Sequence, residues 1–170
     1  MPIDGCKNTF AELALTVLPK NMQEIRRAME DPWPLAKFCE RGVGVKTIAR
    51  QLNRTDDFSG CYVLLHHAKP FYVGISRGVV GRLRQHGTGT THFDASLAYR
   101  IARERVTHKM TREAAMKDPV FRRAFEEAQQ LLTRCTVAFI EIPNALELYL
   151  FEAYCAMELD TSRWNTFQTH

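Results

Sequence analysis

Apolar residues recur at helical spacing along residues 1–58. Thr9 and Asn21 belong to the residue types that cap helices, and an apolar stripe follows each of them, so we expect two helices here. Two prolines then interrupt the pattern, and a further helical run covers residues 45–52. The pattern therefore predicts a helical N-terminal extension over residues 1–58.

Sequence typical of strands begins after residue 58. Residues 60–65 and 71–73 are rich in β-branched and aromatic side chains, and the short segment between them contains a proline, so they predict a β-hairpin. Residues 135–142 are rich in Val, Ile and Phe and predict a third strand. Strands and helices therefore both contribute to the expected fold.

Helical patterns occupy most of the remaining sequence. A short helix is expected to end near His86, and longer helices are expected over residues 95–109 and 119–133. An aspartate and a proline start the last of these, which is a typical capping pair. A strongly apolar helix is expected over residues 145–159.

Two tyrosines lie at matching places in the predicted hairpin. If the turn centres on His67, Tyr62 faces Tyr72, and their Cβ atoms lie ~5 Å apart on one face of the sheet. Such a pair is often an aromatic ladder that only stabilises a hairpin. Taken alone, the tyrosines favour this structural explanation over a functional one.

The helix after the hairpin carries two residues of chemical interest. Arg82 and His86 are four residues apart and share one helix face, whereas Arg84 points about 200° away from Arg82. A basic helix face in contact with solvent explains this pattern equally well.

The last predicted helix places one glutamate among apolar residues. Glu147 and Glu158 lie about 20° apart around the helix, so both can face solvent. Glu152 lies about 140° from Glu147 and is surrounded by apolar positions. A carboxylate in such a place must pair with a cation or bind a metal, because isolated burial is costly. A salt bridge to an arginine is the structural alternative.

Composition changes this picture little. Hydrophobic residues make up 45% of the 170 residues and charged residues 25%, as in a soluble domain with a core. The net charge of +4 permits a polyanionic partner. The five cysteines include no CxxC pair, so neither a disulfide framework nor a zinc site is expected. We find no signal-peptide pattern and no membrane-spanning run, and we expect a cytoplasmic protein.

Taken together, these motifs resemble the GIY-YIG nuclease superfamily. The first motif corresponds to a Gly-Cys-Tyr triplet and the second to a Tyr-Val-Gly triplet; a helix with arginine and histidine, a helical glutamate and a later asparagine follow in the family's order. The likeness covers about residues 59–92 and 135–166. The residues that carry it are Gly60, Tyr62, Tyr72, Gly74, Arg82, His86, Glu152 and Asn165.

The resemblance implies an α+β fold with a small three-stranded, mainly antiparallel sheet flanked by helices. It implies a catalytic domain over residues 59–170, with an inserted helical pair at about 95–134. Two positions depart from the family pattern. Cys61 replaces the usual isoleucine or valine, and Ile75 stands where DNA-repair members carry a lysine. Lys69, before the second strand, is a weak candidate to replace that lysine.

The resemblance also implies metal-dependent phosphodiester hydrolysis. Glu152 would hold one Mg²⁺ or Mn²⁺ ion, because hard cations prefer oxygen ligands. Arg82 would clamp the scissile phosphate. Tyr62 would activate water, with Tyr72 and His86 positioning it or relaying protons. A phenol has a pKa of about 10 and needs nearby positive charge to act as a base, so His86 stays open as the proton acceptor.

Three residues are expected to support this chemistry. Gly60 belongs to the first motif, and Gly74 allows the backbone to approach a ligand closely. Asn165 would tie the C-terminal segment to the site, although a cap or turn residue is an equal alternative.

Two other classes of function stay open. One is a non-catalytic module that binds nucleic acid on a degenerate nuclease fold. The other is a helical regulator in which residues 37–52 form a DNA-binding helix-turn-helix and the tyrosines belong to the core. For the nuclease, the expected partner is single- or double-stranded DNA, with specificity supplied by residues 1–58, by 95–134 or by a partner. A double-strand break would require a homodimer or two visits, because one site with one metal cuts one strand.

Overall fold

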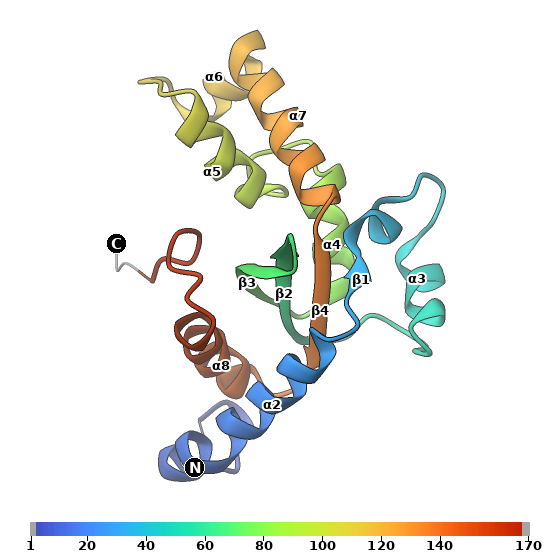
Figure 1. Cartoon of the computed structure of the whole chain (residues 1–170), viewed down its shortest axis with the longest axis vertical. Helices are drawn as coiled ribbons and strands as arrows, with labels where there is room; N and C mark the ends of the chain where they lie inside the picture. Colours follow the sequence, from blue (N-terminus) through green and yellow to red (C-terminus); the bar gives the residue numbers. More distant parts are fainter. Residues whose placement is uncertain (1–2, 168–170) are drawn as a thin grey trace. The chain divides into compact units, whose positions relative to one another are not determined.

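The computed structural model describes residues 3–167 and has an α+β fold. One sheet is combined with helices that precede, interrupt and follow its strands (Figure 1). In chain order the elements are η1 (Ile3–Gly5), α1 (Phe10–Glu12), η2 (Leu13–Val17), α2 (Leu18–Ala28), β1 (Trp33–Pro34), η3 (Leu35–Cys39), α3 (Val45–Gln51), β2 (Gly60–His66), β3 (Lys69–Ser76), α4 (Val79–Thr88), α5 (Ser96–Arg105), α6 (Arg112–Lys117), α7 (Pro119–Thr133), β4 (Thr136–Glu141) and α8 (Ala145–Glu158).

The chain divides into two compact units. The sheet unit contains the residues up to 33, residues 56–79 and the residues from 136 onward. The helical unit contains residues 34–55 and 80–135. The segment 34–55 is therefore grouped with the helices of the middle of the chain and not with the N-terminal helix.

The N-terminal helix starts where the sequence predicts but continues further than expected. Thr9 and Glu12 form a capping box, in which each side chain accepts a hydrogen bond from the other residue's backbone N–H. Asn21 was expected to cap a second helix, and this prediction is wrong. The apolar stripe passes through Asn21 without a break, so α1, η2 and α2 form one helical run from Phe10 to Ala28.

The sheet has four strands in the order β1-β4-β2-β3. Both β3 and β4 pair antiparallel with β2. The prediction of a three-stranded sheet is therefore wrong by one strand, the two-residue β1 at Trp33–Pro34. A strand this short shows no periodicity in the sequence, and its proline is typical of edge strands, where one backbone N–H is not needed.

The hairpin of β2 and β3 is confirmed, but its register differs from the predicted one. His67 and Ala68 both have positive φ and form a two-residue turn, and a bulge lies between Leu64 and Leu65. As a result Tyr62 faces Gly74, so the direct pairing of Tyr62 with Tyr72 is wrong. Alternation along the strands still places the two tyrosines on the same face.

The core of the sheet unit lies on the opposite face of β2 and β3. Cys61, Val63 and Val73 point toward this core, and β4 and the helices α2 and α8 also contribute side chains to it. The helix α8 packs against both β2 and β3. Its buried residues are Leu148, Phe151, Cys155 and Ala156.

Three helices, not the predicted pair, occupy the middle of the helical unit. Helix α5 stops at Arg105, short of the expected residue 109, because Val106 takes an extended backbone conformation. Thr111 then caps the unexpected helix α6 by accepting a hydrogen bond from the backbone of Ala114. Helix α7 begins as predicted, with Asp118 as its cap, and both α5 and α6 pack against it.

No helix within residues 3–167 combines the length and the apolar character needed to cross a membrane.

Candidate functional site

The eight residues singled out in the sequence fall in both units. Arg82 and His86 lie on α4 in the helical unit. The other six lie on β2, β3, α8 and the segment after α8, and all belong to the sheet unit; they are Gly60, Tyr62, Tyr72, Gly74, Glu152 and Asn165. The meeting of all eight at one phosphate therefore stays a prediction.

The two tyrosines are neighbours on one face of the hairpin. The centroids of the Tyr62 and Tyr72 rings lie 6.3 Å apart, with an angle of 53° between the ring planes. Tyr62 is buried, with only 1% of its surface exposed, whereas Tyr72 is half-buried. Tyr72 is therefore the tyrosine of the pair that a ligand can reach more directly.

At two positions of the hairpin, neighbouring atoms leave no room for a side chain larger than that of glycine. A Cβ atom at Gly74 would lie 2.4 Å from both Cζ and Oη of Tyr62, so only glycine lets the tyrosine ring lie against β3. A Cβ atom at Gly60 would lie 2.1 Å from the carbonyl oxygen of Ile140 on β4. Both glycines therefore serve the packing of the sheet, and Gly74 positions the ring of Tyr62.

We expect Gly74→Ala to lower the free energy of unfolding by roughly 1–3 kcal/mol, because the buried Tyr62 ring cannot move away without strain. Urea unfolding measures this change. Gly44→Ala is the control, since a Cβ atom there meets nothing within 4 Å. Adding Tyr62→Leu to Gly74→Ala should recover part of the loss. Equal stabilities of the Gly74→Ala and Gly44→Ala variants would contradict this account.

Asn165 is attached to the free edge of β3. Its side-chain Nδ2 donates a hydrogen bond of 2.7 Å to the carbonyl oxygen of Val73, and its Oδ1 accepts one of 2.9 Å from the Val73 N–H. The amide thus pairs with β3 as a neighbouring strand would, next to Tyr72. Its backbone N–H also closes a turn by donating to the carbonyl oxygen of Thr161, so Asn165 is a turn residue whose side chain ties the C-terminal segment to β3.

Glu152 is a half-buried carboxylate on α8. Burial raises its pKa above the ordinary value. Among residues 3–167 it makes no hydrogen bond and no ion pair, so the salt bridge to an arginine considered for it is not formed there. The other two glutamates of α8 do have partners, since Glu147 accepts a hydrogen bond from Asn8 and Glu158 pairs with Arg26.

The surroundings of Glu152 show which side of the sheet it approaches. Burial raises the pKa of the Cys61 thiol well above its ordinary value, and Cys155 and the charge of Glu152 raise it further. Glu152 therefore lies within electrostatic range of Cys61, on the face that α8 covers. Tyr62 follows Cys61 in β2, so its ring projects from the other face.

Arg82 is held by hydrogen bonds within the helical unit. Its guanidinium donates three hydrogen bonds: one of 2.7 Å to the carbonyl oxygen of Asp94, one of 2.9 Å to the hydroxyl of Ser96 and one of 3.1 Å to the side chain of Gln85. These bonds fix the position of the guanidinium but occupy several of its donors. Arg84 points elsewhere, as expected, and donates to the carbonyl oxygens of Phe38 and Val43.

His86 is completely buried on α4. Burial lowers its pKa to about 3, and the positive charge of Arg82 contributes to the same effect. The ring is therefore neutral near pH 7 and a weak base. This pKa makes His86 a poor proton acceptor and better suited to positioning a neighbour.

The positions that depart from the family pattern are explained by packing. Ile75 is half-buried and contacts the core of the sheet unit, so the place of the family's lysine is used for packing. Lys69 is exposed at the start of β3, at the end of the strand far from Ile75. Lys69 and Ile75 therefore lie at opposite ends of β3.

Glu152 is the residue for which the sequence predicts a metal-binding role. Within residues 3–167 no group of three or more His, Cys, Asp or Glu side chains is arranged to bind a metal ion. Glu152 does fit a cation, because it is an acidic side chain that is half-buried and has no partner in that part of the chain. A single carboxylate suits Mg²⁺, which keeps several waters and shares its remaining positions with substrate phosphate.

The chain was compared with known protein families, proteins and structures. No protein family, curated protein or solved structure matches it. The resemblance to GIY-YIG nucleases therefore rests on the order and spacing of residues in its own sequence.

Proposed function

We propose that this protein is a metal-dependent endonuclease of the GIY-YIG type that hydrolyses phosphodiester bonds in DNA. The observation that carries the proposal is the half-buried carboxylate of Glu152, which lacks a partner within residues 3–167 and lies on the helix that packs against the tyrosine-bearing hairpin. Burying an acidic group without a partner is unfavourable, and proteins retain such groups mainly where they bind something.

The edge of β3 is where the groups of the sheet unit can act on one substrate. The tyrosine rings project from one face of the hairpin and Glu152 lies on the side of the other face. Because β3 is the last strand of the sheet, a nucleic-acid backbone beside the part of this edge that Asn165 leaves open could contact both sides. Asn165 holds that edge in place beside Tyr72.

Each residue has a distinct task in this proposal. Glu152 would hold the cation, which when bound supplies positive charge to the phosphate and to the leaving oxygen. Tyr72 would contact the attacking water and Tyr62 would orient Tyr72 through their ring contact. Arg82 would bind phosphate oxygens with the donors that its own unit leaves unused. His86 would position α4 as a neutral ring.

The proposal is tested by incubating the full chain with single-stranded DNA, duplex DNA and structured RNA, each with Mg²⁺, Mn²⁺ or EDTA. We expect cleavage of DNA with Mg²⁺ or Mn²⁺ and none with EDTA. Gel analysis of end-labelled strands reports both the substrate class and the number of strands cut. Absence of cleavage with all three substrates and both metals would overturn the proposal.

A non-catalytic nucleic-acid-binding module is the second candidate. The hydrogen bonds from Arg82 to Asp94, Ser96 and Gln85 favour it, because a guanidinium held by its own unit has fewer donors left for a phosphate. The same incubations separate the two functions. Binding of DNA that is unchanged by metal, without any cleavage, would support the module.

A further inference from the structure

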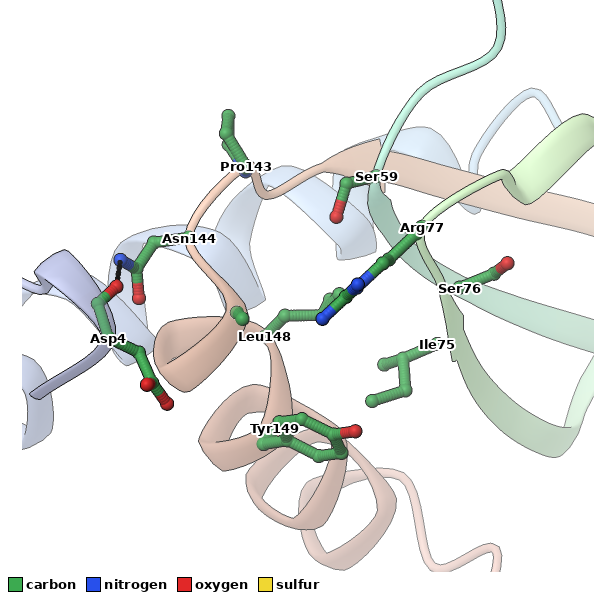
Figure 2. Close-up of a pocket in the computed structure, with 10 residues that line it drawn as sticks. Asp4, Ser59, Ile75, Ser76, Arg77, Pro143, Asn144, Leu148 and Tyr149 are labelled. Carbon is green, nitrogen blue, oxygen red and sulfur yellow. Dashed lines mark hydrogen bonds between the residues drawn. The ribbon is translucent and has the colours of Figure 1, made fainter.

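A pocket of about 490 Å³ opens where the end of β3 meets the start of α8. All of its lining residues belong to the sheet unit. Figure 2 shows Arg77 reaching across it from the end of β3 toward Leu148, with Tyr149 following Leu148 in α8. The polar and charged side chains that line it with Tyr149 are Asp4, Ser59, Ser76, Arg77 and Asn144.

Arg77 is a cation without a protein partner. Its side chain is exposed, and it makes no hydrogen bond or ion pair with any residue between 3 and 167. The serine hydroxyls nearby are already engaged, since Ser59 donates to the carbonyl oxygen of Ile142 and Ser76 to that of Gly78. The guanidinium of Arg77 is therefore the main group in the pocket that can bind an anion.

The pocket also offers an aromatic surface. The side chain of Tyr149 is 67% exposed, although it lies on a helix that is otherwise strongly apolar. Leu148 and Ile75 add an apolar wall beside it. An exposed tyrosine next to apolar side chains suits a flat aromatic ring, and a nucleobase stacks on such a surface with little dependence on sequence.

Helix geometry places this pocket close to Glu152. Tyr149 precedes Glu152 by three residues on α8, so the two side chains are neighbours on the helix surface. On the strand side, Ile75 lines the pocket and pairs with Cys61, whose thiol is within electrostatic range of Glu152. A ligand in the pocket would thus lie about one helical turn from the proposed metal-binding carboxylate.

We infer that this pocket binds one nucleotide of the DNA strand that is cut, with Arg77 on its phosphate and Tyr149 stacked on its base. This inference rests on the proposed function, because it treats the nucleotide as a neighbour of the scissile phosphate. Asp4 is the one acidic side chain of the pocket, and Asn144 holds it there through a hydrogen bond to its backbone carbonyl oxygen. Its charge opposes a phosphate and keeps the affinity for a single nucleotide low.

The pocket can be tested without cleavage by measuring how tightly deoxythymidine 3′,5′-bisphosphate binds to the full chain. Calorimetry in the presence of EDTA gives this affinity. We expect Arg77→Gln and Tyr149→Leu each to weaken binding about tenfold. Asp4→Asn should strengthen it. Arg27→Gln, which removes the same charge from an exposed position on α2 outside the pocket, should leave binding unchanged.

Duplex DNA gives an independent measurement. In Arg77→Gln the slope of the logarithm of affinity against the logarithm of salt concentration should fall by about 1, because one phosphate contact is lost. The Michaelis constant for cleavage should rise about tenfold, with a smaller change in the maximal rate. Far-UV circular dichroism checks that the variants are folded.

The outcomes separate this inference from the proposed function. Suppose that the wild-type chain cleaves DNA in a metal-dependent way, but Arg77→Gln weakens neither bisphosphate binding nor DNA affinity. This result would overturn the inference and leave the proposed nuclease function intact. Bisphosphate binding that depends on Arg77 and Tyr149, in a chain that cleaves nothing, would support the nucleotide pocket and overturn the nuclease.

Discussion

Glu152→Gln is expected to lower the rate of DNA cleavage roughly 10²- to 10³-fold while DNA binding is retained. Glutamine has the shape of glutamate but lacks the negative charge that a cation requires. Glu158→Gln is the matched control, because it makes the same change on the same helix at an exposed residue whose partner is Arg26. Cleavage rates with Mg²⁺ and binding in EDTA give the two readouts.

The same variant should be more stable than the wild-type chain at neutral pH. Burial raises the pKa of Glu152 in the folded state, so the unfolded chain ionises at a lower pH than the folded one. The free energy of unfolding therefore falls as pH rises from the ordinary pKa of 4.5 to the raised value, and the loss persists above it. Glutamine does not ionise, so the variant does not suffer this loss in the free energy of unfolding. A variant that lost both cleavage and stability would show that Glu152 is a structural residue.

Acidification is expected to destabilise the wild-type chain through His86. The pKa of this buried ring is lowered from 6.5 to about 3, so below pH 6.5 the unfolded state takes up a proton that the folded state does not. The stability contributed by the neutral ring is present above pH 6.5 and is lost as pH falls toward 3. The expected slope is about 1.4 kcal/mol for each pH unit.

Urea unfolding between about pH 7.5 and pH 5 measures this slope before most carboxylates begin to titrate. The slope should largely disappear in His86→Gln, whatever that substitution costs at pH 7. His67→Gln is the control, since His67 is exposed in the hairpin turn. If His86→Gln does not fold, NMR of the wild-type ring gives the answer directly. A His86 signal that titrates between pH 7.5 and 5 would contradict the account.

The two sets of measurements also separate the chemical roles within the proposed site. A His86 ring that stays neutral to low pH cannot produce an acidic limb near pH 6.5 in the cleavage rate. The water would then be activated beside Tyr72, and His86 would act by holding α4. A rate profile that follows a group with a pKa near 6.5 would point to another titrating residue.

Features that depend on neighbours in the sequence were predictable for this protein. The cap at Asp118 and the helix α7 it starts, the apolar helix α8 and the two strands of the hairpin all agree with the sequence prediction. Each depends on local capping, propensity and periodicity, which the order of residues states directly. The same holds for the shared face of Tyr62 and Tyr72, since alternation along a strand survives a change of register.

The detailed backbone conformation and contacts between distant parts of the chain decided the rest. The positive φ values of His67 and Ala68 and the bulge after Leu64 set the register, and neither has a clear signal in the sequence. The short strand β1 exists only through its pairing with β4. The pocket between Arg77 and Tyr149 joins residues far apart along the chain, for which the motif pattern offered no signal.

The sequence by itself determined which side chains are available for chemistry, their order and the elements that carry them. Tertiary structure alone decided the surroundings of those side chains: Glu152 without a partner in residues 3–167, Asn165 bonded to Val73, and His86 neutral. The physical reason is that burial, pairing and pKa depend on what packs around a group, and packing brings together residues that the sequence keeps apart.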